Sequence, residues 1–270
     1  DGVHRSLDGG MTWERVGEPV VTDRVTALAS DPIDADRFYL GTEPSAVYRS
    51  DDGGETWSPM DGLTDLRSSS TWSFPPRPHT HHVRWIEPDP HVRGRLYVGI
   101  EAGALLVTGD GGETWDERPA GSRSDNHQLA AHPSAPGRVY SAAGDGYAES
   151  TDGGRTWTHP QAGLDHRYVW SVAPDPADPD TVLVSSASGA YAAHSQPATS
   201  YVYRRAGGGE WDRLDGLPTG DGVTRAVLTA TGGGAFVAAT NRGVYRTADA
   251  GDTWSPVEFD WPGRFDTQAV

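Results

Sequence analysis

Short runs of alternating apolar and polar residues, each ended by turn-forming residues, follow one another along most of the chain. In residues 24–30 the two kinds of residue alternate, and the run ends at Asp31 and Pro32. Residues 37–41 and 46–50 form two further runs, and a fourth begins at Trp57. Alternation over so few residues is typical of a half-buried β-strand. The four runs therefore predict one antiparallel sheet of four short strands.

The turn before the fourth run has a sequence that recurs. Residues 50–57 read SDDGGETW, and close copies occupy residues 6–13, 108–115, 150–157 and 247–254, with a decayed copy, AGGGEW, at residues 206–211. An Asp followed by two glycines predicts a tight turn, because the carboxylate accepts hydrogen bonds from the backbone of its own turn and glycine adopts positive φ at no steric cost. Copies at spacings of roughly 40–60 residues indicate a repeat architecture.

The pattern S-x-D-G-G-x-T-W resembles the Asp-box (BNR) repeat of sialidase-like β-propellers, which is also found in photosystem assembly factors. The resemblance covers nearly the whole chain and implies that each four-stranded sheet is one blade, with the Asp boxes in structural turns. The F/Y-R-I-P segment of sialidases does not occur here. We therefore carry over the fold from this resemblance and not the sialidase activity.

We predict a single all-β domain over residues 1–270, a six-bladed β-propeller of four-stranded antiparallel blades. Residues 1–6 match residues 145–150, which precede the fourth box, so the chain begins in the middle of a blade. Residues 265–270 resemble another innermost strand. We expect these N- and C-terminal strands to close the ring in one composite blade. That blade lacks a second strand, which indicates residues missing at one or both ends.

The negative charge of the chain disfavours some classes of binding partner. It carries 22 basic and 38 acidic residues, a formal net charge of −16, and no cysteine or lysine. Such an acidic chain disfavours nucleic acid and anionic membrane surfaces as partners, because both need a basic face. The composition resembles that of a halophile's proteins. We expect a cytoplasmic monomer, with secretion left open because the chain starts at Asp1.

An insertion at residues 63–80, rich in Ser and Pro, interrupts the repeats and cannot be a central strand. We predict an ordered loop that crosses one mouth of the propeller, and the alternative is a flexible surface loop. Trp72, Phe74 and the prolines favour order. Among the tryptophans, Trp72 is the strongest candidate for stacking on a ligand.

Most of the candidate functional residues lie in loops on the face opposite the Asp boxes. In Asp-box families that face holds the ligand funnel, and converging polar groups at such a mouth are the default site hypothesis. The candidate ligand-binding residues lie in loops that enter innermost strands or join second to third strands. They are Arg24, Glu43, His81, His82, Arg84, Glu101, His127, Asp145, His166, Arg167 and Arg225.

Three kinds of chemistry fit these residues. The imidazoles of His82, His127 and His166 could hold a divalent metal with an added carboxylate, or they could only line the channel by hydrogen bonding. The arginines suit recognition of a carboxylate, unless each pairs with a neighbouring acid. A glutamate or aspartate with a histidine partner could act as acid and base, although most loop carboxylates are merely solvated.

Our leading functional hypothesis is a propeller that binds a small acidic or sugar-like ligand in a His- and Arg-lined funnel, with a metal as one candidate cofactor. The first alternative is a glycoside hydrolase or lyase that uses a funnel histidine and a carboxylate. The second is a non-catalytic scaffold for protein interactions. The sequence does not name the substrate and gives no catalytic residue.

Overall fold

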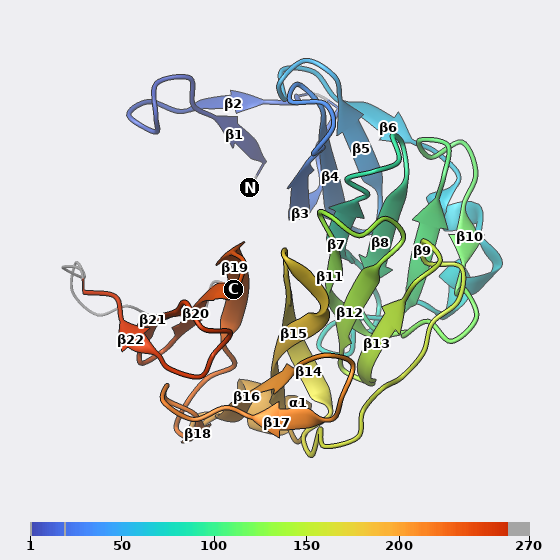
Figure 1. Ribbon diagram of the computed structural model, residues 1–270. Helices are drawn as coiled ribbons and strands as arrows, with labels where there is room; N and C mark the ends of the chain where they lie inside the picture. The colour runs from blue at the N-terminus through green and yellow to red at the C-terminus, as the bar shows by residue number, and fades with distance from the viewer. Residues whose placement is uncertain (1, 19, 259–270) are drawn as a thin grey trace. The chain divides into compact units, whose positions relative to one another are not determined.

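A computed structural model describes residues 2–18 and 20–258 of the chain (Figure 1). Its regular structure is mostly antiparallel β-sheet, with one short helix, α1 (Ala190–His194), and two 3₁₀ turns, η1 (Leu63–Asp65) and η2 (Arg67–Thr71). The predicted all-β fold is confirmed. Residues 265–270 lie outside the described residues, so ring closure and the number of blades stay predictions. No helix in the described ranges is both long and apolar enough to span a bilayer.

The chain divides into two compact units, which we describe separately. The first comprises residues 1–131 with 154–156, and the second comprises residues 132–153 with 157–270. Within each unit, the hydrogen-bonded order of the strands in a sheet follows their order along the chain. This is the arrangement that the alternating runs predict, since neighbouring strands are joined by short turns.

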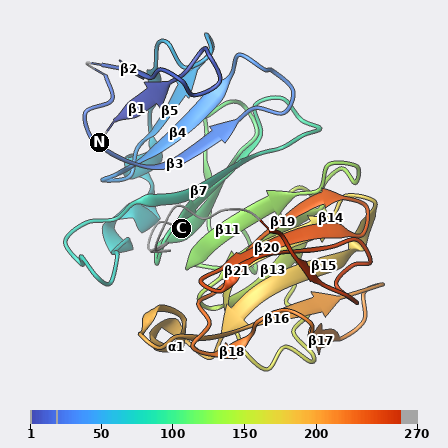
Figure 2. The ribbon, with the colours of Figure 1, turned by 90° about the vertical axis from the view of Figure 1, so that its left-hand side faces the viewer.

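The first unit contains one hairpin, two complete four-stranded sheets and the strand that opens the next sheet. The strands are β1 (Val3–Arg5), β2 (Glu14–Val16), β3 (Arg24–Ser30), β4 (Phe38–Glu43), β5 (Val47–Ser50), β6 (Ser58–Met60), β7 (Val83–Pro88), β8 (Leu96–Ile100), β9 (Ala104–Thr108), β10 (Asp116–Glu117) and β11 (Asn126–Ala131). The strands β3, β7 and β11, each the first of its sheet in chain order, lie side by side (Figure 2).

The second unit contains a hairpin and two larger sheets. Its strands are β12 (Val139–Ala143), β13 (Gly146–Ser150), β14 (Tyr168–Asp175), β15 (Asp178–Ala187), β16 (Thr199–Arg205), β17 (Trp211–Arg213), β18 (Gly220–Asp221), β19 (Val227–Gly232), β20 (Ala235–Thr240), β21 (Gly243–Thr247) and β22 (Ser255–Pro256). Strand β18 pairs with β16 outside the main order of its sheet.

The Asp-box turns have the geometry that the motif predicts. In residues 50–57, Ser50 Oγ donates to Asp52 Oδ1 (2.8 Å) and accepts the Gly54 N–H (2.9 Å). Asp52 Oδ1 accepts the Thr56 N–H (2.9 Å), and the Trp57 indole N–H donates to the Gly54 carbonyl (3.0 Å). Residues 6–13 and 247–254 repeat this set of bonds. These aspartates are therefore structural, as expected.

A β-bulge near the start of an innermost strand is a feature that the alternating pattern did not predict. The pairing register shifts between Val25 and Ala27 in β3, and between Val83 and Trp85 in β7. A bulge leaves one residue unpaired and re-aims its side chain. In β7 that residue is Arg84, and its redirected side chain forms part of the candidate site.

Candidate functional site

Five polar side chains of the first unit meet where β7 and β11 begin and β8 ends. They are His82, Arg84, Glu101, Asp125 and His127, which we call the Glu101 cluster. The side chains of His82 and His127 are almost fully buried, at 8% and 0% exposure, whereas that of Asp125 is 29% exposed. The fold thus brings together four of the predicted site residues. They and Asp125 lie around the carboxylate of Glu101, which is 14% exposed.

Glu101 is the centre of this cluster. Its Oε2 lies 2.9 Å from His82 Nε2 and 3.4 Å from Arg84 Nε. Burial by itself would raise the pKa of Glu101, but the His82 hydrogen bond and the positive charges of His127, His82 and Arg84 outweigh burial. The pKa of Glu101 therefore lies below its ordinary value, and the carboxylate is ionised at neutral pH.

Asp125 and His127 approach Glu101 from the loop that enters β11. One oxygen of Asp125 accepts the backbone N–H of Ala102 (2.9 Å), and the other lies 3.8 Å from His127 Nε2. One atom from each of Glu101, Asp125 and His127 lies within 4.8 Å of the other two. Ala102 has a φ of 49°, a left-handed conformation that is uncommon for a residue with a side chain. The Ala102–Asp125 bond therefore links this strained turn to the cluster.

Glu43 forms a second carboxylate centre in the same unit. Arg77 donates to both of its oxygens, with Nε–Oε1 at 2.8 Å and Nη2–Oε2 at 2.6 Å, and Arg24 Nη1 lies 3.6 Å from Oε2. The hydrogen bonds from Arg77 hold the pKa of Glu43 below its usual range. Arg77 was not among the predicted site residues. Its position between two prolines of the insertion gave no periodic signal.

The insertion is ordered, as predicted, because it contributes to the core. Leu63 and Trp72 are 3% and 5% exposed and belong to the same apolar cluster as residues of β7, β8 and β9. The Trp72 indole N–H donates to Ser68 Oγ (3.1 Å), and its ring meets His81 edge-on. The expectation that Trp72 stacks on a ligand is wrong, because its ring is buried in packing contacts. His81 Nδ1 accepts the Ser45 N–H (3.3 Å).

The other predicted site residues belong to the second unit. His166 Nδ1 bonds to the Tyr203 hydroxyl (2.5 Å), and its ring stacks on Tyr201. Arg225 lies over the ring of Trp170, 3.9 Å from its centroid, and donates to the Ala193 carbonyl.

The two remaining predicted residues of that unit, Asp145 and Arg167, are exposed. Asp145 lies in the turn between β12 and β13, and Arg167 donates to the Leu164 carbonyl (3.3 Å). The fold therefore gives the predicted histidines different surroundings. His82 and His127 belong to the Glu101 cluster, and His166 belongs to a tyrosine cluster of the other unit.

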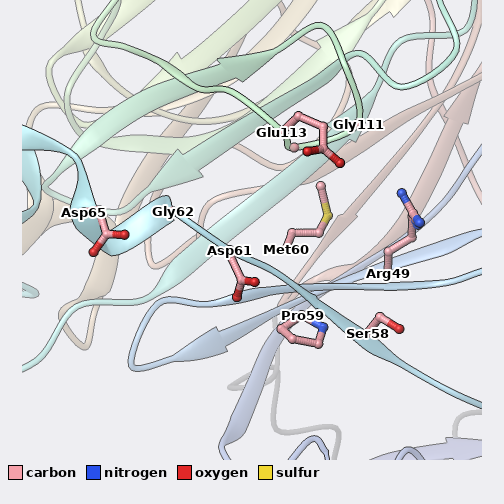
Figure 3. A pocket seen from close by; sticks show the side chains of 10 residues that line it. Arg49, Ser58, Pro59, Met60, Asp61, Gly62, Asp65, Gly111 and Glu113 are labelled. Carbon is pink, nitrogen blue, oxygen red and sulfur yellow. The ribbon is translucent and has the colours of Figure 1, made fainter.

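A cavity of about 390 Å³ lies elsewhere in the first unit, beside the Asp-box turn of residues 108–115 (Figure 3). Its lining includes Arg49 of β5, Met60 of β6 and the carboxylates Asp61, Asp65 and Glu113. None of the lining residues belongs to the Glu101 cluster. Arg49 is paired with Asp51 (3.0 Å), so the cavity is acidic. Among the residues that the structure describes, its exposed carboxylates have no ion pair like those of Glu101. We therefore place the candidate site at the Glu101 cluster.

Comparison with known proteins identifies the repeat and its relatives. Residues 48–59 match the BNR/Asp-box repeat family. The chain is 25% identical to xyloglucanase Xgh74A of Acetivibrio thermocellus over 250 residues, which cover 78% of this chain and 28% of that protein. The chain thus spans less than a third of the length of this relative.

Two solved structures share the fold. An ancestral GH74 enzyme superposes with a TM-score of 0.73 at 16% identity, covering 98% of this chain and 37% of the other. The GH74 xyloglucanase from Xanthomonas campestris superposes with a TM-score of 0.68 at 19% identity, covering 95% and 42%. At these identities the two structures establish a shared architecture only.

Proposed function

Because the chain has the fold of BNR-type β-propeller proteins, we propose that it is the carbohydrate-binding part of a glycoside hydrolase and that the Glu101 cluster contacts the sugar. The sequence similarity to a xyloglucanase supports a glucan of the xyloglucan type as the ligand. The observation that carries the proposal is an ionised carboxylate, Glu101, that two basic side chains hold in place beside the partly exposed Asp125.

The chemistry of this cluster suits sugar hydroxyls. An ionised carboxylate is a pure acceptor, and charge-assisted hydrogen bonds from hydroxyl groups are about twice as strong as neutral ones. Glu101 is prevented from rotating by His82 and Arg84, so little side-chain entropy is lost when a sugar binds. Asp125 adds a second acceptor within 4.8 Å of Glu101.

The ion pairs of the first unit argue against the acidic ligand that the sequence also suggested. Arg24 and Arg77 contact Glu43, and Arg84 contacts Glu101. Each of these guanidinium groups already has a carboxylate partner inside the chain. A neutral polyol fits such a site better than a second carboxylate, which would have to compete for the same donors.

Bond cleavage requires two carboxyl groups, one that protonates the leaving oxygen and one that acts as base or nucleophile. The lowered pKa of Glu101 suits the base or nucleophile and not the acid. Our proposal assigns no proton donor to this chain. The chain spans 28% of its xyloglucanase relative, and we propose cleavage for the longer protein of which such a segment forms part.

Calorimetric titration of the chain with xyloglucan oligosaccharides tests this proposal. Glu101→Gln should weaken binding at least tenfold, because the substitution removes the charge and replaces one acceptor by a donor. Glu14→Gln is the matched control. Glu14 is 56% exposed, pairs with Arg5 in the β1–β2 hairpin and should leave the affinity unchanged.

Two results would overturn the proposal. The first is a folded Glu101→Gln variant that binds the oligosaccharides as tightly as the original chain. The second is an original chain that binds neither xyloglucan nor unbranched glucan oligosaccharides, which would favour the scaffold alternative.

A further inference from the structure

The geometry points to a divalent transition-metal site made by Glu101, Asp125 and His127 in the first unit. This site differs from the set of three histidines that the sequence suggested. It does not depend on the proposed sugar binding, because the three side chains converge on each other within the chain. Any sugar or water would occupy the remaining positions around the ion.

The three donors already meet the main geometric requirement for a shared ion. Their candidate ligand atoms lie within 4.8 Å of one another. Ligands at 2.0–2.2 Å from one zinc ion must be about 3–4 Å apart, so a small contraction is enough. Both contacts of Glu101 with His82 and Arg84 are made to the same oxygen, Oε2. We take the other oxygen, Oε1, as the ligand atom that Glu101 offers to an ion.

Contacts with neighbouring residues hold these donors in place, as hydrogen bonds to the ligands do in metal sites. His82 Nε2 donates to the Glu101 carboxylate at 2.9 Å, and the Ala102 N–H donates to one oxygen of Asp125. The His127 side chain is fully buried, which restricts its rotation. A histidine binds a metal through its neutral imidazole. With both imidazoles neutral, the two carboxylates outnumber the Arg84 guanidinium, and the resulting net negative charge favours a cation.

The kinds of donor select the kind of metal. Imidazole is a preferred ligand of zinc and other transition metals, whereas magnesium and calcium prefer sites made only of oxygen atoms. One nitrogen and two carboxylates resemble the mixed ligand sets of catalytic zinc sites, which leave a coordination position open. We expect the order of affinity Zn²⁺ over Mn²⁺ over Ca²⁺.

Isothermal titration of chelator-stripped protein with ZnCl₂ tests the site in the absence of sugar. The original chain should bind one tight equivalent. Asp125→Asn should weaken that binding at least tenfold, because it removes a ligand charge while the amide oxygen still accepts the Ala102 N–H. His127→Gln should do the same. His166→Gln, in the second unit, should leave the dissociation constant unchanged.

The outcomes separate this site from the sequence-derived alternative. A titration of Asp125→Asn that superimposes on that of the original chain would overturn the inference, as would an original chain with no saturable zinc binding. Loss of binding in His166→Gln with retention in Asp125→Asn would assign the metal to the three histidines instead. Circular dichroism of each variant identifies any loss that comes from unfolding.

Discussion

The turn at residues 50–57 and the turn at residues 206–211 join the last two strands of their sheets but are stabilised by different interactions. The first is held by bonds among Ser50, Asp52 and Thr56, all within six positions of one another. The second has no Asp or Thr at those positions. Instead, Arg205 donates to the Gly209 carbonyl (3.1 Å).

The guanidinium of Arg205 also pairs with a distant carboxylate. It contacts Glu149 at 2.7 and 3.2 Å, and both side chains are less than 10% exposed. Tyr147 donates to the same carboxylate (2.9 Å), and Trp211 donates to the Pro160 carbonyl rather than into its own turn. Loss of the local motif is therefore accompanied by contacts with residues up to 56 positions away. The turn at residues 50–57 is therefore stabilised by bonds within the turn, whereas the turn at residues 206–211 is stabilised by tertiary contacts.

The largest expected effect comes from breaking the distant pair. Arg205→Met should lower the free energy of unfolding of the second unit by about 3 kcal/mol, because the buried Glu149 loses both hydrogen bonds from Arg205 and keeps only Arg138, 3.8 Å away, as a cationic partner. Urea denaturation measures the loss. The double variant Glu149→Leu with Arg205→Met should recover much of it, since the buried carboxylate is gone and Arg138 keeps its pair with Asp180 (2.9 Å). A single Arg205→Met variant as stable as the original chain would contradict the account of this turn.

A second expected effect concerns Glu87, another carboxylate with a partner far along the chain. It accepts the Ala131 N–H (2.9 Å) and the Trp85 indole N–H (3.2 Å), and burial raises its pKa to about 7. A raised pKa in the folded state means that the neutral form is favoured. The protonated Glu87 carboxyl contributes fully to stability below the ordinary glutamate pKa near 4.5. This contribution is lost as the pH rises through 7.

Glu87→Gln isolates this contribution. From pH 4.5 to 8, the original chain should lose about 3 kcal/mol of unfolding free energy that the variant does not lose. Parallel urea titrations at several pH values measure the difference. Identical pH profiles for the two proteins would show that the Glu87 carboxyl is not desolvated.

The smallest expected effect is in the local turn. Hydrogen bonds from Thr56 and Ser50 lower the pKa of Asp52 to about 2. A lowered pKa means that the ionised Asp52 carboxylate stabilises the folded state. This contribution to stability is complete above the ordinary pKa near 4 and is lost as the pH falls through 2. An NMR titration of the Asp52 carboxyl carbon should give a midpoint near 2. A midpoint near 4 would mean that the turn bonds do not form in solution.

The contrast between the two turns also explains what the sequence could predict. The Asp-box turns follow from side chains a few positions apart, so their bonds could be anticipated from the motif. The repeats identified two kinds of loop, those that enter the first strand of a sheet, with His82, Arg84 and His127, and those that join its second and third strands, with Glu101. The structure places these four side chains in one cluster, and their role in ligand binding stays a prediction. Asp125 was not among the predicted ligand-binding residues, although it stands two positions before His127.

The features that sequence analysis missed all depend on tertiary contacts. The bulge that turns Arg84 toward Glu101 leaves no mark in the alternating pattern. Trp72 was expected to face a ligand, yet it packs in the core because the insertion folds back on β7 to β9. The pairing of Arg77 with Glu43 joins residues 34 positions apart. Contacts of this kind require the fold to be known first.

The most direct test of the central claim is a crystal structure of the chain with a xyloglucan oligosaccharide bound. We predict that sugar hydroxyls lie within hydrogen-bond distance of Glu101 and Asp125. A sugar bound instead in the acidic cavity beside Met60, with no ordered ligand at Glu101, would contradict the account.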